Sequence, residues 1–156
     1  MKKVMILGLL PVMLAMIKPT VFSHCEVPCG IYNDEMRFTM IEEHITTIEK
    51  AMTEIAALSK EDPRNMNQIV RWIMNKEQHA DDIQHIISQY FLTQRLKLVD
   101  KEDSKAANEL IQKLTFCHEI LVFAMKTKQT TDLASVESLK AAVSNFKSVY
   151  FKNHKH

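Results

Sequence analysis

Apolar residues recur every three or four positions along most of the chain, which is the period of an α-helix with one buried face. Between Asp34 and Ser59 this stripe is unbroken, and it consists of Phe38, Ile41, Ile45, Ile48, Met52 and Ile55. After residue 32 the chain contains no glycine and only one proline, Pro63, so the turn residues of a β-protein are almost missing. The pattern therefore predicts an all-α protein.

Three further segments show the same period, and residues that cap helices stand at their starts. The predicted helices cover about residues 34–59, 63–92, 104–127 and 131–151, and the capping signals are Asp62-Pro63, Asp103-Ser104 and Thr131-Asp132. Helices of this length joined by short connections favour an antiparallel up-down-up-down four-helix bundle. The stripe of the second helix is interrupted at Lys76 and Glu77, which leaves room there for a polar patch facing a partner or a site.

The first 23 residues have a different pattern from the rest of the chain. Lys2 and Lys3 precede an apolar run from Val4 to Ile17, which is shorter than the ~20 residues of a membrane-spanning helix. We expect a signal peptide-like leader over residues 1–23 that is cleaved after Ser23. The other interpretations are an uncleaved anchor and a cut a few residues away.

Cleavage would leave a single domain over residues 24–156, with no stable membrane anchor. We expect this domain to be exported, either to the periplasm or to the medium, and a cytoplasmic protein with a processed leader is the alternative. The leader contains three lysines and no acid, so its removal changes the formal charge from +1 to −2. Nothing in this charge suggests a nucleic-acid partner. Cys117 lies inside the apolar stripe of the third helix, so we interpret it as a small buried hydrophobe rather than a ligand.

The segment His24-Cys25-Glu26-Val27-Pro28-Cys29-Gly30-Ile31-Tyr32, called the hook below, collects metal ligands at the expected new N-terminus. Cleavage before His24 would free an amine beside an imidazole, an amide nitrogen and the thiols of Cys25 and Cys29. Thiolates favour late transition metals, and nitrogen donors suit square-planar nickel or copper. Pro28 and Gly30 are compatible with a tight loop between the two thiols. A local disulfide between Cys25 and Cys29 is the simpler structural alternative.

The hook resembles the N-terminus of the nickel-containing superoxide dismutases, which reads His-Cys-x-x-Pro-Cys-Gly-x-Tyr. The match covers His24, Cys25, Pro28, Cys29, Gly30 and Tyr32. The resemblance implies that the His24 amine and imidazole, the Cys25 amide nitrogen and the thiolates of Cys25 and Cys29 hold one nickel ion per subunit. It also implies a homohexamer of four-helix bundles, a maturation protease that exposes His24, and disproportionation of superoxide to dioxygen and hydrogen peroxide as nickel alternates between divalent and trivalent states.

The same resemblance suggests which residues surround the metal. Tyr32 and Tyr90 match the two tyrosines that gate the site and form hydrogen bonds there. In the better-known bacterial pattern, a glutamate of the first helix and an arginine of the second orient the axial imidazole. These positions fall here on Met40 and His79, so His79 is our candidate for the residue that holds the His24 ring.

The changes at Met40 and His79 leave a second function open, which is an exported nickel- or copper-binding bundle without turnover. A thiol–disulfide protein is a third interpretation, but the hook lacks the two-residue cysteine spacing and the βαβ context of that class. The other helix histidines, His44, His85 and His118, are expected to be surface or capped residues rather than ligands.

Overall fold

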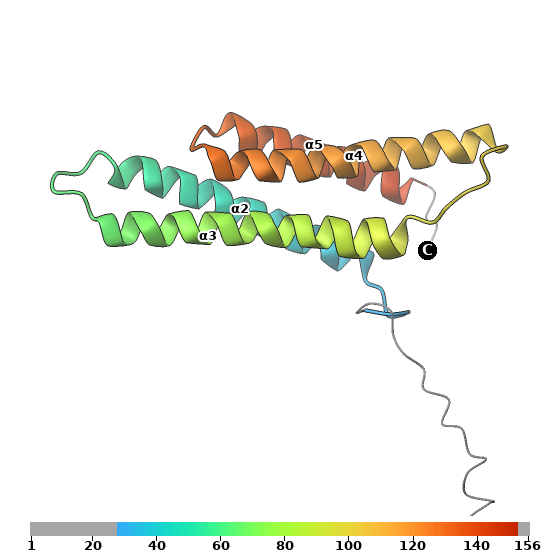
Figure 1. Ribbon diagram of the computed structural model, residues 1–156, viewed down its shortest axis with the longest axis horizontal. Helices are drawn as coiled ribbons and strands as arrows, with labels where there is room; N and C mark the ends of the chain where they lie inside the picture. Colours follow the sequence, from blue (N-terminus) through green and yellow to red (C-terminus); the bar gives the residue numbers. More distant parts are fainter. Residues whose placement is uncertain (1–27, 153–156) are drawn as a thin grey trace, which may run out of the picture. The chain divides into compact units, whose positions relative to one another are not determined.

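The computed structural model describes residues 28–152, and within them four α-helices pack side by side (Figure 1). These are α2 (Asp34–Leu58), α3 (Met66–His85), α4 (Ser104–Gln129) and α5 (Ala134–Phe151), and a π-helical segment, η1 (Ile86–Arg95), continues α3. Helices α2 and α4 each pack against both α3 and α5, and successive helices run in opposite directions. The predicted antiparallel all-α bundle is confirmed. Among the described residues, none of the helices combines the length and the apolar character needed to cross a bilayer.

Helices α2, α3 and α4 begin at side chains that accept hydrogen bonds from free backbone N–H groups, whereas the side chain of Leu133, which precedes α5, forms no such bond. Asn33 accepts from the N–H of Met36 at 3.0 Å, and Asp103 accepts from the first turn of α4 as its sequence signal predicts. Helix α3 begins at Met66 rather than at Pro63, because Asn65 caps it by accepting from the N–H of Gln68. Asparagine caps a helix as well as aspartate does, and Asn65 lies closer to the apolar stripe than Asp62.

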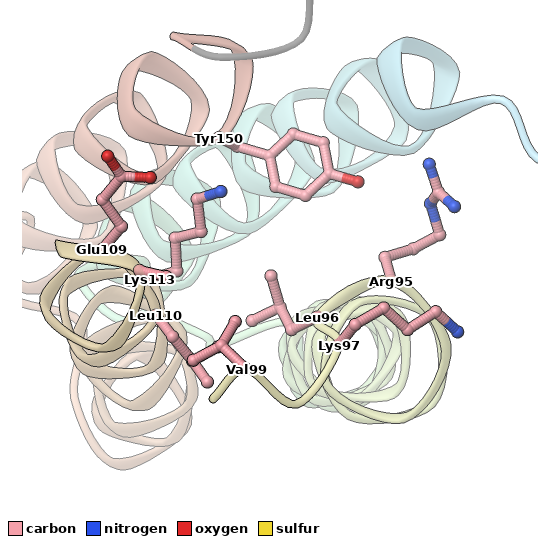
Figure 2. A pocket seen from close by; sticks show the side chains of 9 residues that line it. Arg95, Leu96, Lys97, Val99, Glu109, Leu110, Lys113 and Tyr150 are labelled. Atoms are coloured by element: carbon pink, nitrogen blue, oxygen red, sulfur yellow. The ribbon is translucent and has the colours of Figure 1, made fainter. Parts of the chain in front are cut away.

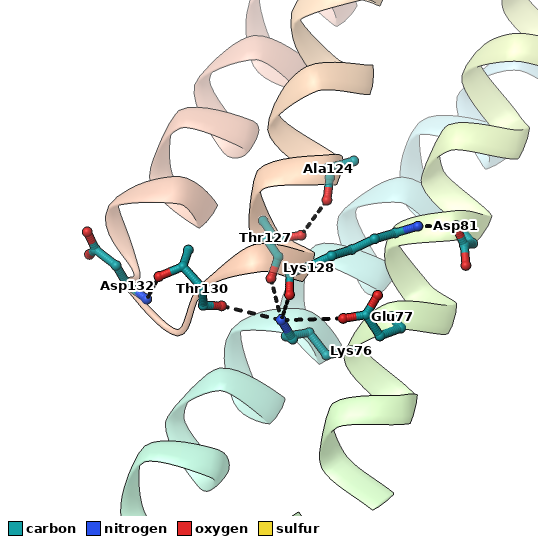
Figure 3. Close-up of polar contacts among 8 residues, drawn as sticks. All are labelled: Lys76, Glu77, Asp81, Ala124, Thr127, Lys128, Thr130 and Asp132. Carbon is teal, nitrogen blue, oxygen red and sulfur yellow. Dashed lines mark hydrogen bonds and ion pairs between the residues drawn. The ribbon is translucent and has the colours of Figure 1, made fainter. Parts of the chain in front are cut away.

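The polar interruption of the α3 stripe at Lys76 is explained by packing against the end of α4 (Figure 3). Lys76 is 3% exposed, and its Nζ donates to the carbonyl oxygens of Thr127 and Lys128 at 2.7 and 2.5 Å. A third, longer hydrogen bond reaches the carbonyl oxygen of Thr130 at 3.3 Å. The last carbonyls of a helix have no partner within the helix and carry partial negative charge. Lys76 therefore caps the C-terminal end of α4.

Aromatic rings fill the core between α2, η1 and α5. Phe38 and Phe91 pack with their ring centroids 4.9 Å apart, and Phe91 meets Phe146 edge to face at 5.1 Å. All three are fully buried, which stabilises the fold by roughly 2–3 kcal/mol for each ring. Tyr150 packs on the same rings and is 1% exposed. This core holds in register the three elements that carry the polar cluster described below.

Segment η1 has the i to i+5 hydrogen bonds of a π-helix, as in the bond from the N–H of Leu96 to the carbonyl of Phe91 at 2.9 Å. In a regular α-helix, residues five apart point about 140° away from each other. Here Tyr90 and Arg95 are five apart and both reach the carboxylate of Asp34. Since π-helical segments are rare and are frequently found at functional sites, the end of the bundle that contains η1 is a candidate functional region.

Candidate metal centre

The described part of the hook contains one of the three predicted metal ligands. Cys29 is an exposed thiol that has no disulfide partner within residues 28–152. Gly30, which follows it, has a φ of +77°, a value that side chains other than glycine rarely adopt. A Cβ added there would meet no atom within 4 Å, so the backbone conformation and not the available space requires glycine. His24 and Cys25 lie outside the described residues.

The two tyrosines named from the sequence lie together at the start of the bundle. The rings of Tyr32 and Tyr90 meet edge to face, with their centroids 5.9 Å apart and an angle of 75° between their planes. Tyr32 is 37% exposed, whereas Tyr90 is buried. The pair thus spans from the surface to the interior, and its exposed member, Tyr32, follows Cys29 by three residues in the chain.

Beneath this pair, the Asp34 carboxylate accepts four hydrogen bonds from three side chains. The Tyr90 hydroxyl donates to Oδ1 at 2.6 Å, and the Tyr150 hydroxyl donates to Oδ2 at 2.9 Å. Arg95 donates from Nε to Oδ1 at 2.7 Å and from Nη2 to Oδ2 at 2.6 Å, which is a two-pronged guanidinium–carboxylate pair. We call Asp34, Tyr90, Arg95 and Tyr150 the Asp34 cluster. It ties the first turn of α2 to η1 and α5.

The Asp34 cluster changes the acidity of its members. Burial alone would raise the pKa of Asp34, but the hydrogen bonds from Arg95 and the two tyrosines outweigh burial and lower that pKa. Burial and the hydrogen bond to Asp34 raise the pKa of Tyr90 to about 12. The pKa of Tyr150 is raised for the same two reasons. At neutral pH Asp34 is therefore ionised, and both phenols keep their protons.

Two arginines lie against the faces of the tyrosine pair. The Arg95 guanidinium carbon lies 4.3 Å from the Tyr32 ring centroid, and that of Arg37 lies 4.9 Å from the Tyr90 centroid. A cation over an aromatic face contributes about 0.5–1 kcal/mol at exposed sites and more where water is excluded. Arg37 also donates to the sulfur of Met40 at 3.7 Å, the position to which the resemblance assigns a glutamate. The arginines thus fix the orientation of both rings.

A pocket of about 200 Å³ borders the Asp34 cluster on the α4 side (Figure 2). It is lined by Arg95, Leu96, Lys97, Val99, Ala106, Glu109, Leu110, Lys113 and Tyr150. Lys97 and Lys113 bring two amines to this wall, and Glu109 brings one carboxylate. The pocket therefore has an excess of positive charge beside the cluster.

One ring nitrogen of His79, the residue predicted to hold the His24 ring, already has a partner within the bundle. Its Nδ1 lies 2.7 Å from Nδ1 of His44, on the neighbouring helix α2. His44 was expected to be a surface or capped residue, and that expectation was incomplete because both rings are half-buried between α2 and α3. Since its Nδ1 is engaged, His79 has only Nε2 left for another partner. Its role toward His24 stays a prediction.

A family model described as nickel-containing superoxide dismutase matches residues 19–155. This span includes the hook, the tyrosine pair and all the described helices. The chain belongs to the nickel-containing superoxide dismutase family. The comparisons with curated proteins and with solved structures found no match. Family membership makes the chain an oxidoreductase that acts on superoxide and uses nickel, as the hook motif predicts.

The donors of this dismutase fit nickel chemically. Cys29 is available as a thiolate ligand because it is exposed and forms no disulfide with any described residue, and the hook places a second thiol and nitrogen donors close to it in the sequence. Cys117 does not compete with it, because it is fully buried in the core and burial raises the pKa of its thiol to about 12. The interpretation of Cys117 as a core residue is confirmed.

Sequence reasoning missed three residues of the site that the tertiary structure brings together. Asp34 resembles an ordinary acidic residue in a first helical turn, and Arg95 lies beyond the predicted end of the second helix at residue 92. Tyr150 lies within the last predicted helix and is buried, and a buried hydroxyl needs a hydrogen-bond partner. The need of the Tyr150 hydroxyl for a partner could have pointed to a polar contact, but it does not identify Asp34 as that partner.

Proposed function

We propose that this enzyme dismutes superoxide at the hook, where His24, Cys25 and Cys29 hold one nickel ion per subunit. The ligand atoms are the His24 amine and imidazole, the Cys25 amide nitrogen and the two thiolates. The observation that carries the proposal is the free, exposed Cys29 within a hook motif that the family match includes. When bound, nickel supplies one-electron redox chemistry between its divalent and trivalent states.

Tyr32 and Tyr90 gate access to the hook. The Tyr32 hydroxyl orders water or superoxide through hydrogen bonds, whereas the Tyr90 hydroxyl, whose proton goes to Asp34, can accept a hydrogen bond from water. Because the pKa of Tyr90 is raised to about 12, its hydroxyl remains protonated at neutral pH and does not act as a base. That hydroxyl donates to Asp34, which holds the Tyr90 ring against Tyr32. Two superoxide anions and two protons yield one dioxygen and one hydrogen peroxide, so both protons come from water rather than from a net loss at these side chains.

The site depends on a maturation protease that cuts between Ser23 and His24. Before the cut, the nitrogen of His24 is an amide that binds metals weakly unless it loses a proton. We place the mature enzyme outside the cytoplasm because of the leader, with a processed cytoplasmic enzyme as the alternative. His79 remains the candidate to hold the His24 imidazole through its Nε2.

The functional test compares four forms of the mature protein. The enzyme starting at His24 should contain one nickel per chain and remove superoxide. A form with one extra residue before His24 should lose activity while its helix content is unchanged. Cys29→Ser should lose nickel, and Cys117→Ala, the matched control, should retain it. A nickel-loaded enzyme that starts at His24 and has no activity would instead support a metal-binding protein without turnover.

We propose a homohexamer for the assembled enzyme. Supporting this, α3 exposes apolar side chains at i, i+4, i+7 and i+8, which lie on one face of the helix; they are Met66, Val70, Ile73 and Met74. An exposed apolar face of this kind is typical of interfaces between subunits. Val70→Glu should reduce the mass measured by analytical ultracentrifugation. Leu98→Glu, at an isolated and 96% exposed position, should leave it unchanged.

A further inference from the structure

Two histidines and an aspartate meet between α2 and α3, away from the Asp34 cluster. His44 comes from α2, and His79 and Asp82 come from α3. One ligand atom from each residue lies within 4.8 Å of the other two, and all three side chains are half-buried. Asp34 precedes His44 by ten residues on α2, so the two clusters are separated by about 15 Å along the helix.

We propose that His44, His79 and Asp82 form a second metal site that binds a divalent transition ion of the zinc type. Two imidazoles and one carboxylate are a common set of protein ligands for such ions. Half-burial leaves room for water at a fourth position, as in sites with three protein ligands. The site is independent of the hook in its donors, since it contains no thiolate.

The spacing of the two imidazole nitrogens is close to that around a bound ion. The two Nδ1 atoms lie 2.7 Å apart. Two imidazole nitrogens on one tetrahedral zinc lie about 3.3 Å apart, given Zn–N bonds of about 2.0–2.1 Å. A change of roughly half an ångström, within the reach of side-chain rotation, separates these values. A single N–H···N hydrogen bond uses one proton, and the nearby Asp82 carboxylate adds negative charge that attracts a cation to the two imidazoles.

The backbone holds these ligands without help from an ion. His79 and Asp82 are three residues apart and so lie on the same face of α3. Ile45 beside His44 and Ala80 beside His79 are buried in the core, which fixes the rotation of each helix. A bound ion would join α2 to α3. It would also stabilise the folded chain, because a ligand that binds the native state and not the unfolded state lowers the free energy of the native state.

The test uses the full chain carrying Cys25→Ser and Cys29→Ser, so that the hook offers no thiolates. We expect this protein to bind one zinc ion in a calorimetric titration. His44→Gln should weaken that binding by more than about 100-fold, because even outer partners of metal ligands contribute roughly 10- to 100-fold. His85→Gln, an exposed histidine on α3, and the pair His154→Gln and His156→Gln are the matched controls, and neither should change the affinity.

Cobalt(II) gives a second measurement that does not depend on activity. In the chain with Cys25→Ser and Cys29→Ser it should show the visible bands of a nitrogen- and oxygen-ligated tetrahedral ion without thiolate charge transfer, because the remaining thiol, Cys117, is buried in the core. Asp82→Asn should alter these bands. The proposal is overturned if this double variant binds no zinc, or if the same chain with His44→Gln binds it unchanged. It is also overturned if His79→Gln alters only the nickel spectrum of the intact enzyme, because His79 would then serve the hook alone. None of these results depends on superoxide turnover.

Discussion

Asp34→Asn tests whether the Asp34 cluster holds the tyrosine end of the bundle together. The substitution preserves the size of the side chain and removes its charge. The amide retains one acceptor oxygen, while its NH₂ group now faces donors. At least two of the four hydrogen bonds to this side chain are therefore lost, and Arg95 keeps its charge without a counterion.

The expected loss of stability follows from how deeply these groups lie. The side chains of Asp34 and Arg95 are 14% and 20% exposed. A hydrogen bond to a charged group contributes about 1.5–3 kcal/mol, and breaking a fully buried ion pair costs about 3–5 kcal/mol. Allowing for partial exposure, we expect the free energy of unfolding to fall by about 3 kcal/mol. For a domain of this size, that lowers the melting temperature by about 10 °C.

Thermal unfolding followed by circular dichroism, at fixed subunit concentration, measures this loss. The matched control is Asp81→Asn, whose 57% exposed side chain pairs with Lys128 on the surface and should cost less than about 1 kcal/mol. Ultraviolet titration of the phenols gives a second measurement, because the pKa of Tyr90 should fall below about 12 when the carboxylate is removed, while burial keeps it above its ordinary value. Equal melting temperatures for the two variants would refute the cluster as a stabilising element.

Three further predictions concern acid stability, Cys117 and Lys76. The pKa of Asp34 in the folded protein lies below its unfolded value of ~3.9. The difference in unfolding free energy between wild type and Asp34→Asn should therefore be at its full size above pH ~3.9. Acid unfolding curves should show this difference shrinking as the pH falls through the folded pKa. Cys117→Ala should lose on the order of 1 kcal/mol in urea unfolding and retain full activity; loss of nickel would mean that this thiol is a ligand. Lys76→Met should cost about 1–3 kcal/mol by the same measurement because α4 carbonyls lose their donor, whereas an effect no larger than that of Lys128→Met would contradict the capping role.

The fold and the hook are readable from the sequence because their signals are local. Each apolar stripe repeats within one helix, so Phe38 to Ile55 define the buried face of α2 without reference to any other helix. The hook brings its thiols and nitrogen donors together along nine consecutive residues, so its chemistry requires no knowledge of packing. Cys117 was placed correctly for the same reason, since its position in a stripe decides its burial.

The contacts between helices could not be read in this way. Asp34 meets Tyr90 and Tyr150 across 56 and 116 residues, and His44 meets His79 across 35. Which side chains meet depends on how far each helix is shifted and rotated relative to its neighbours. The sequence of a single helix does not specify this shift or rotation. The π-helical turn of η1 adds a local rotation that a regular helical period does not contain.

The sequence by itself therefore determined the helical class, the order of the helices and the chemistry of the hook, because periodicity and neighbouring donors are properties of short segments. Only the tertiary structure decided that Asp34 holds the Tyr90 hydroxyl, that Lys76 caps α4, and that His44 and His79 form a pair. The physical reason is that a buried polar group must find its hydrogen-bond partner in whatever register core packing imposes. That register results from the joint packing of rings such as Phe38, Phe91 and Phe146.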